Sequence, residues 1–155
     1  MELIIIFSAK YLDYVLLAVF LILFLKNRSK NFLLIPLISA LISRFIFTEL
    51  IRFFYFRPRP FVEQGVSPLF EHAPSASFPS GHAAFFFALS AGVYHYNKKA
   101  GLWFFAVSSL MGLARVLAGV HYLTDIFGGL LIGLSAYFLV RIFFKKKQDQ
   151  IPVLP

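Results

Sequence analysis

Cysteine is absent from this sequence of 155 residues, and charged residues make up only 14% of it. Without cysteine the chain forms no disulfide, no thiolate nucleophile and no cysteine metal site, and its redox compartment cannot be inferred. An ordinary soluble domain contains about 25% charged residues. Here the scarcity of charge is accompanied by 59% hydrophobic residues, more than a soluble domain of this length has the interior to bury. The composition therefore indicates an integral membrane protein.

Acidic residues are also few, at seven against fifteen Lys and Arg, which gives a formal net charge of +8. An excess of positive charge is one mark of a nucleic-acid-binding protein, but this chain has no soluble basic face to carry that role. We therefore expect no nucleic-acid partner. The distribution of the basic residues fits membrane topology better.

Five long apolar stretches stand out, at residues 11–25, 32–56, 83–96, 101–120 and 123–144. Most of them approach the roughly 20 residues that a membrane-spanning helix needs, and the third needs residues 80–82 or residue 97 to do so. None of them alternates strictly between apolar and polar residues, as a barrel strand does. We predict an all-α fold, a polytopic membrane helix bundle of about five transmembrane helices, in one domain over residues 1–155.

Basic residues form three clusters along the chain. The clusters are Lys26 with Arg28 and Lys30, Lys98 with Lys99, and Lys145 with Lys146 and Lys147. With five spans the three clusters fall on one side of the membrane, which should be the cytoplasmic side. We therefore expect a multi-pass protein of the cytoplasmic membrane with an outer N-terminal segment over residues 1–10. We also expect an irregular cytoplasmic tail over residues 145–155, and the long loop over residues 61–78 to lie outside.

Polar residues gather at the predicted outer ends of separate spans. They are Arg52, Arg57, Arg59, Ser80, Gly81, His82, Arg115, His121 and Asp125. Charged residues near membrane depth are costly and usually mark a functional site. Guanidinium groups bind phosphate oxygens in a bidentate fork, whereas a divalent metal wants several carboxylates. The set therefore predicts a phosphate site with no metal and no cofactor.

The spacing of these residues suits phosphoryl transfer, which needs charge neutralisation, an in-line nucleophile and a proton for the leaving oxygen. His121 and Asp125 are four residues apart, so a helical turn places them on one face. The carboxylate can then hold one ring nitrogen as N–H and leave the lone pair of the other for phosphorus. His82 is free to act as the general acid. Ser80 and Gly81 open a helix whose hydroxyl and N–H groups can cradle phosphate oxygens.

Three segments follow one another in a characteristic order: Arg52-x6-Arg59-Pro60, then Pro79-Ser80-Gly81-His82, then Arg115-x5-His121-x3-Asp125. They resemble the three signature motifs of the type-2 phosphatidic acid phosphatase superfamily, which also includes the vanadium haloperoxidases. The resemblance covers approximately residues 11–144. It implies a membrane phosphatase fold and a reaction through a phosphohistidine intermediate.

Carried over residue by residue, the resemblance implies that His121 is the nucleophile, Asp125 its orienter and His82 the acid. It also implies a set of phosphate-binding residues, namely Arg52, Arg59 and Arg115 with support from Ser80 and Gly81. The chain departs from the family pattern at two positions. Arg52 stands where the family usually has lysine, which keeps the charge but replaces a point ammonium by a planar fork. Ala114 stands where it usually has serine, which removes one hydroxyl contact.

Two segments, Arg57–Phe61 and Ala76–Ser80, look most like bacterial undecaprenyl-diphosphate phosphatases of the bacitracin-resistance type. That likeness implies hydrolysis of undecaprenyl diphosphate to undecaprenyl phosphate and orthophosphate. The alternatives are a phosphatase for phosphatidate, phosphatidylglycerophosphate or lipid A, or a lipid phosphotransferase. A small membrane anion transporter is an alternative of a different class, but a transporter distributes its polar groups along a pathway through the membrane. The expected partners are a lipid phosphate or diphosphate and the bilayer, and the oligomeric state stays open.

Four further residues have a structural interpretation at this point. Arg57 falls outside the motif spacing, so we interpret it as an interfacial anchor. Glu49 lies about one helical turn before Arg52 and is expected to be its ion-pair partner. His72, in the outer loop, and His95, at the cytoplasmic edge, are expected to be structural or surface residues.

Overall fold

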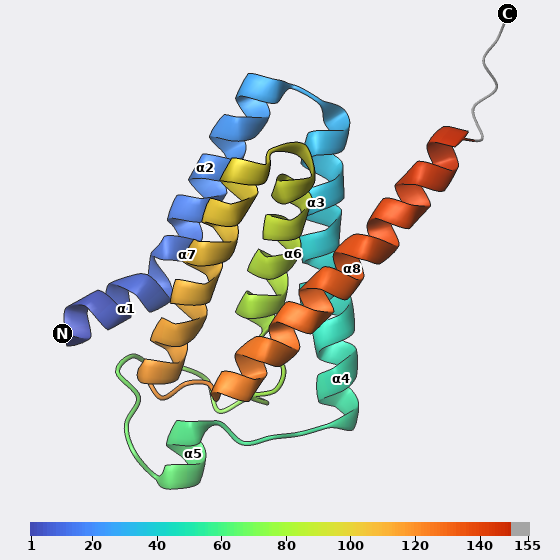
Figure 1. Cartoon of the computed structure of the whole chain (residues 1–155). Coiled ribbons are helices and arrows are strands. Elements are labelled where there is room, and N and C mark those ends of the chain that lie inside the picture. The colour runs from blue at the N-terminus through green and yellow to red at the C-terminus, as the bar shows by residue number, and fades with distance from the viewer. Residues whose placement is uncertain (150–155) are drawn as a thin grey trace, which may run out of the picture.

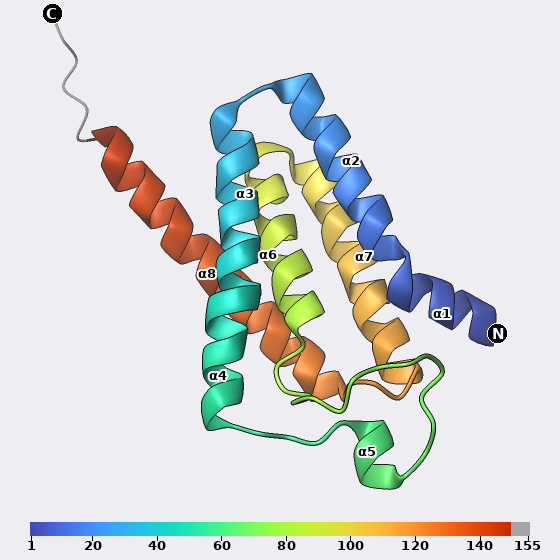
Figure 2. The same cartoon turned by 180° about the vertical axis from the view of Figure 1, so that it is seen from behind.

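The structure, a computed structural model, describes residues 1–149. Its helices are α1 (Glu2–Lys10), α2 (Leu12–Asn27), α3 (Lys30–Ile42), one π-helical turn η1 (Ser43–Phe47), α4 (Thr48–Phe54), α5 (Pro60–Gln64), α6 (Gly81–Tyr96), α7 (Lys98–Leu117) and α8 (Leu123–Asp149). They form a bundle with the two short turns α2–α3 and α6–α7 at one end (Figures 1 and 2). No β-strand occurs within residues 1–149, so the predicted all-α class is confirmed.

Three helical segments are long and apolar enough to cross a membrane on their own: Lys30–Phe54, Lys98–Leu117 and Leu123–Lys145. The pair α1 and α2, which is bent by 43°, passes the same test as one broken span. Helix α6 has only 16 residues, and eleven of them are buried. At 1.5 Å per residue it is about 24 Å long, shorter than the roughly 30 Å of a hydrocarbon core. Among the described residues at most four segments thus pass the test for a membrane span, and α6 is a fifth, shorter helix at the centre of the bundle, so the count is roughly consistent with the predicted five spans.

N-cap side chains fix where α6 and α7 begin. The Ser80 hydroxyl accepts a hydrogen bond from the backbone N–H of Ala83 at 3.4 Å, and the Asn97 side chain accepts one from Ala100 at 3.0 Å. Capping of this kind satisfies N–H groups that have no partner within the helix. Because the two caps lie at opposite ends of the bundle, α6 and α7 run antiparallel (Figure 1).

Glycines let α8 approach α6 closely near its own start. A Cβ atom at Gly129 would lie 2.6 Å from the Cβ of Ala83, and one at Gly133 would lie 2.6 Å from the carbonyl oxygen of Ala84. Any larger residue would push the two helices apart, as is usual where membrane helices pack through small residues. Further along, α8 crosses the bundle obliquely and leans away from it (Figure 1).

The two ends of the bundle differ in their chemistry. We name one the basic end, because its turns and the end of α8 carry Lys26, Arg28, Lys30, Lys98, Lys99 and Lys145. The other, which we name the motif end, holds α5, the long loop over residues 65–80, the end of α7 and the starts of α6 and α8 (Figures 1 and 2). The predicted placement of the basic clusters on one side of the bundle is confirmed for these residues; the side chains of Lys146 and Lys147 lie outside the described part.

The prediction of an irregular tail over residues 145–155 is wrong for its first part. Helix α8 continues through Asp149. The reason is that Lys and Gln are good helix formers, so the change from apolar to polar residues ends the apolar stretch without ending the helix. Residues 150–155 lie outside the described residues.

Candidate active site

The turn from α7 into α8 brings His121 and Asp125 together, as their spacing predicts. The two residues are 2% and 0% exposed. Nδ1 of His121 lies 3.2 Å from Oδ2 of Asp125. An ionised carboxylate can only accept, so the proton sits on Nδ1 and Nε2 keeps its lone pair. The imidazole therefore presents a nucleophilic nitrogen in a fixed direction.

Asp125 is held by several donors besides His121. The Ser77 hydroxyl and the backbone N–H of Tyr122 both donate to Oδ2, the latter at 2.8 Å. Arg57 donates to Oδ1 at 3.1 Å. A carboxylate with this many partners has one orientation, and it passes that orientation on to the imidazole. The motif spacing did not reveal the role of Ser77, although the residue lies in the segment Ala76–Ser80 that carries the finer family likeness.

The interpretation of Arg57 as an interfacial anchor is wrong. Besides its bond to Asp125, it donates to the Thr124 hydroxyl at 2.7 Å. Its guanidinium carbon lies 3.8 Å from the centre of the Tyr122 ring, a cation–π distance. The buried carboxylate attracts the guanidinium, so Arg57 belongs to the polar network of the site.

Arg59 is a second cation of the site and is only 2% exposed. Its Nη1 donates to the carbonyl oxygen of Val120 at 2.8 Å and lies 3.1 Å from Nε2 of His121. Its other nitrogens donate to the Ser75 carbonyl and hydroxyl and to the Ala76 carbonyl, at 3.1 to 3.3 Å. These bonds lock the guanidinium beside the nucleophilic nitrogen of His121.

Burial sets the charge states of this pair. Burial lowers the pKa of His121 to about 4, against the opposing effect of its hydrogen bond to Asp125. The imidazole is therefore neutral at neutral pH, the form in which a histidine can serve as a nucleophile. Burial and the nearby charge of Arg52 lower the pKa of Arg59 to about 10, so its guanidinium still carries its charge there.

The start of α6 is tied to both other motifs. Arg52 donates to the carbonyl oxygen of Pro79 at 2.9 Å, and the backbone N–H of Ser80 donates to the carbonyl oxygen of Asp125 at 3.0 Å. The expected ion pair between Arg52 and Glu49 is confirmed, at 3.3 Å. The three motif segments therefore meet at one place.

Arg44, on the π-helical turn η1, escaped the sequence analysis. A Cβ atom at Gly81 would lie 2.6 Å from its Nε, so glycine is what allows this side chain to lie against the start of α6. Arg44 also forms an ion pair with Glu49. Single π-helical turns within α-helices are frequent at functional sites. The available signal was a lone arginine inside an apolar stretch.

Asp13, in the first turn of α2, was also missed, because a lone charged residue in an apolar stretch does not reveal its partner. Its Oδ2 lies 3.4 Å from Nε2 of His82 and 3.4 Å from Nη2 of Arg115. The N-terminal helix pair thus contributes a carboxylate to the site and links two predicted site residues. Among the described residues, Nε of Arg115 and Nε of Arg52 are buried without a hydrogen-bond partner, so both remain available to an anion.

A cavity of about 240 Å³ adjoins His82 between α2 and α6. Its polar lining includes Arg44 and Asp13, and its apolar lining includes Leu17 and Phe85. An amphiphile with an anionic head and a hydrocarbon chain suits such a lining.

His72 comes closer to the site than the sequence suggested. The loop that carries it folds back over the motif end, and its ring centre lies 6.2 Å from that of His121. Burial lowers the pKa of His72.

Among the side chains that the structure describes, no three His, Asp or Glu form a group that could hold a metal ion, and metal independence stays a prediction.

Comparison with known proteins identifies relatives of this chain. The chain is 35% identical over 125 residues to the undecaprenyl-diphosphatase BcrC of Bacillus subtilis (strain 168), an alignment that covers 81% of this chain and 63% of that protein. It is 31% identical over 136 residues to the bacitracin transport permease protein BcrC of Bacillus licheniformis, covering 86% and 67%. The chain therefore spans about two thirds of the length of these curated relatives.

A solved structure and a family model complete the comparison. The crystal structure of Aquifex aeolicus LpxE superposes with a TM-score of 0.74 at 30% identity, covering 90% of this chain and 84% of that one. The sequence model of the PAP2 superfamily matches residues 32–149, which include all three motif segments. The chain belongs to the PAP2 superfamily.

Proposed function

We propose that this chain is a lipid phosphatase that hydrolyses an isoprenoid lipid diphosphate, with undecaprenyl diphosphate as the substrate and undecaprenyl phosphate and orthophosphate as products. The observation that carries the proposal is the buried His121–Asp125 pair with the Arg59 guanidinium 3.1 Å from Nε2 of His121. An oriented imidazole beside a fixed cation suits attack on a phosphate group. The undecaprenyl-diphosphatase among the relatives supports the choice of substrate.

In the first step Nε2 of His121 attacks the terminal phosphorus. The N–P bond forms while the bond from phosphorus to the bridging oxygen breaks, and that oxygen leaves with the lipid monophosphate. His82 supplies a proton to the leaving oxygen. Arg59 and Arg52 stabilise the charge that builds up on the transferred group.

In the second step water attacks the phosphohistidine. His82, now deprotonated, takes a proton from the water while the N–P bond breaks. Orthophosphate leaves and His121 returns to its neutral form. No group outside the chain, the lipid and water is needed to balance the two steps.

Arg44 favours a diphosphate over a monophosphate substrate. In an in-line displacement the leaving group departs opposite the nucleophile, on the side where His82 acts. The cavity on that side is lined by His82 and Arg44. A diphosphate leaves a second phosphate there, which needs a cation, whereas a monophosphate ester leaves only an alcohol.

A panel of purified lipid phosphates tests the substrate and the metal requirement together. Orthophosphate release is measured in detergent with undecaprenyl diphosphate, phosphatidate, phosphatidylglycerophosphate and lipid A, with and without excess chelator. We expect the highest kcat/KM with undecaprenyl diphosphate and no effect of the chelator. A preference for another lipid would replace the substrate, and activity that returns only with added magnesium or zinc would overturn the metal-free mechanism.

We further propose that the motif end faces the outside of the cytoplasmic membrane, with the C-terminal end of the chain in the cytoplasm. The concentration of Lys and Arg at the basic end supports this orientation. Single cysteines at Gln64 and Lys99, both exposed, test it in this cysteine-free chain. A membrane-impermeant thiol reagent applied to intact cells should label position 64; labelling of position 99 instead would invert the topology.

A further inference from the structure

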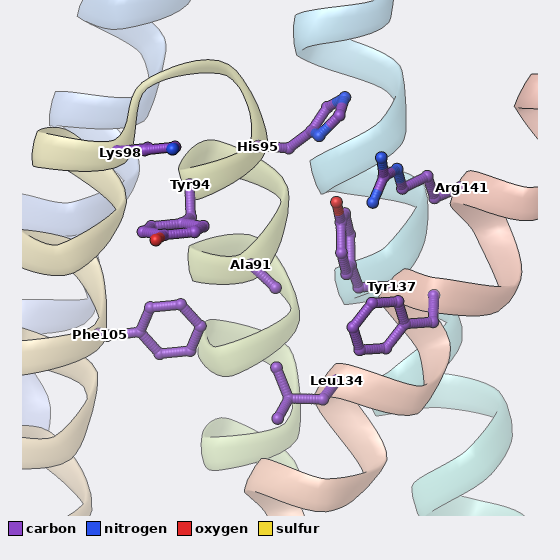
Figure 3. A pocket seen from close by; sticks show the side chains of 9 residues that line it. Ala91, Tyr94, His95, Lys98, Phe105, Leu134, Tyr137 and Arg141 are labelled. Atoms are coloured by element: carbon purple, nitrogen blue, oxygen red, sulfur yellow. The ribbon is translucent and has the colours of Figure 1, made fainter.

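A second cavity, of about 360 Å³, lies near the basic end between α6, α7 and α8 (Figure 3). It shares no lining residue with the motif segments. Its part farther from the α6–α7 turn is apolar and includes Phe105 and Leu134. Lys98 and Arg141 lie at the end nearer that turn, which we name the mouth of the cavity (Figure 3). The cavity is thus amphipathic along its length.

The cavity follows from the path of α8. Gly129 and Gly133 hold α8 against α6 near the motif end, and beyond them α8 leans away (Figure 1). The next residues on that face are large. They follow the helical spacing of one face, at Leu134, Tyr137, Phe138 and Arg141, and all four line the cavity. Along α8, small residues that pack closely against α6 are therefore followed within two turns by large residues that line the cavity.

The mouth of the cavity carries uncompensated positive charge. Lys98 from α7 and Arg141 from α8 are both exposed, and His95 lies between them in Figure 3. No carboxylate lines the cavity. Among the described side chains no ion pair includes Lys98 or Arg141. Two cations on different helices therefore line one cavity, an arrangement that suits an anion.

We infer that this cavity binds an anionic phospholipid of the leaflet at the basic end. The lipid phosphate contacts Lys98 and Arg141, and an acyl chain lies against Phe105 and Leu134. Basic pockets between membrane helices are suited to anionic headgroups, and a guanidinium is the better phosphate partner of the two cations. The apolar wall distinguishes such a lipid from free phosphate, which would leave that wall without a ligand.

This site is independent of the proposed reaction. None of the residues assigned to phosphoryl transfer lines the cavity, and the cavity lies at the other end of the bundle. A bound lipid would fill the space between α8 and the rest of the bundle. It would therefore stabilise the folded protein by mass action, because it binds the native state and not the unfolded one.

Thermal unfolding of the purified protein in a neutral detergent tests the inference. Phosphatidylglycerol, phosphatidylcholine or inorganic phosphate is titrated in turn. We expect phosphatidylglycerol alone to raise Tm. For the double variant Lys98→Gln/Arg141→Gln, we expect the apparent Kd for phosphatidylglycerol to rise about fivefold per cation, roughly 25-fold in total.

The matched control is Lys26→Gln/Lys99→Gln, which removes the same charge from exposed positions at the same end outside the cavity lining. It should keep the affinity of the unaltered protein. Equal weakening in both double variants would show diffuse attraction by the basic end and overturn the site. A rise in Tm with inorganic phosphate would show an anion site that needs no lipid chain. An unchanged Kd for phosphatidylglycerol in Lys98→Gln/Arg141→Gln would show that Lys98 and Arg141 do not bind the lipid.

Turnover of the lipid substrate verifies that both double variants are folded. If the proposed phosphatase activity is itself absent from the unaltered protein, far-UV circular dichroism and the Tm without lipid serve instead. A second variant, Arg141→Lys, keeps the charge but loses the guanidinium fork. It should bind phosphatidylglycerol with an affinity between those of the unaltered protein and the double variant, and an affinity as low as that of the double variant would contradict a role for charge.

Discussion

The motif end and the basic end of the bundle hold positive charge in different ways. At the motif end Arg59 and Arg115 are 2% and 4% exposed, and their guanidinium groups are fixed by carbonyl oxygens or by Asp13. At the basic end Lys98 and Arg141 are exposed and, among the described side chains, form no ion pair. A fixed, buried cation can stabilise a transition state without reorganising. An exposed, mobile cation gives reversible binding that salt screens.

This difference also explains why the motif end needs so many partners for each charge. A buried charge is costly unless it is paired and hydrogen-bonded. The network around Asp125 therefore draws on three segments of the chain, with Arg57 from one, Ser77 from another, and His121 and Tyr122 from the turn before α8. Removing one member of this network should lower turnover, whereas single substitutions at the basic end should leave turnover unchanged.

The largest expected effect is that of His121→Ala. Loss of the proposed nucleophile should lower kcat at least about 10⁴-fold and abolish the proposed phosphoenzyme, because residues that act as a unit do not compensate for one another. Orthophosphate release and acid-quenched trapping of labelled phosphoenzyme measure the two quantities. His95→Ala makes the same chemical change at the basic end and should leave turnover unchanged. Near-normal turnover by His121→Ala would refute the assignment.

Asp125→Asn should have the next largest effect. The amide preserves the shape of the side chain but can donate to Nδ1, which allows the wrong tautomer of His121 and lowers kcat by roughly 10²–10⁴-fold. The control is Glu71→Gln, the same isosteric change at an exposed carboxylate in the loop over the motif end. If both variants lose activity equally, general charge rather than orientation of the imidazole explains the effect.

The contacts of Asp125 also show what the sequence predicts and what it does not. The span arithmetic predicted that three separated segments meet at one end, and the i,i+4 spacing predicted the contact between His121 and Asp125. Both follow from local periodicity. The ion pair of Glu49 with Arg52 was predicted for the same reason, since its residues are three apart.

Residues that depend on the tertiary arrangement were not predictable in this way. Asp13 reaches His82 and Arg115 only because α2 packs beside α6 and α7. Arg44 reaches Gly81 from the π-helical turn η1, which the periodicity of apolar residues does not predict. In both cases the sequence offered a lone charge in an apolar stretch, which indicates a site but not its partner.

Arg44→Gln should have a smaller and selective effect. Glu49 keeps its ion pair with Arg52, so the change removes the cation beside His82 without leaving that carboxylate unpaired. We expect kcat/KM for undecaprenyl diphosphate to fall about tenfold, the value of one charge-assisted hydrogen bond, while kcat/KM for phosphatidate stays unchanged. Arg28→Gln, at the basic end, is the matched control. Equal losses on both substrates would place Arg44 at the transferred phosphate instead.

The smallest expected effect concerns pH. Burial lowers the pKa of His121 to about 4, so the group stays neutral and active above that value and is protonated as pH falls through it. At pH 5.5 only about 3% of such a group is protonated, against about 90% of a histidine with its ordinary pKa of about 6.5. Between pH 7 and pH 5.5 the ascending limb of kcat/KM should therefore be almost flat, once the separately measured titration of the substrate is divided out.

The same lowered pKa also affects folding: the unfolded chain binds the proton first, so the stability contributed by this group is complete above about pH 6.5 and is lost progressively toward pH 4. Circular dichroism at each pH confines the kinetic analysis to the folded range. A tenfold loss by pH 5.5 in folded protein would show that His121 titrates with the ordinary pKa of a histidine, and that burial does not set its charge.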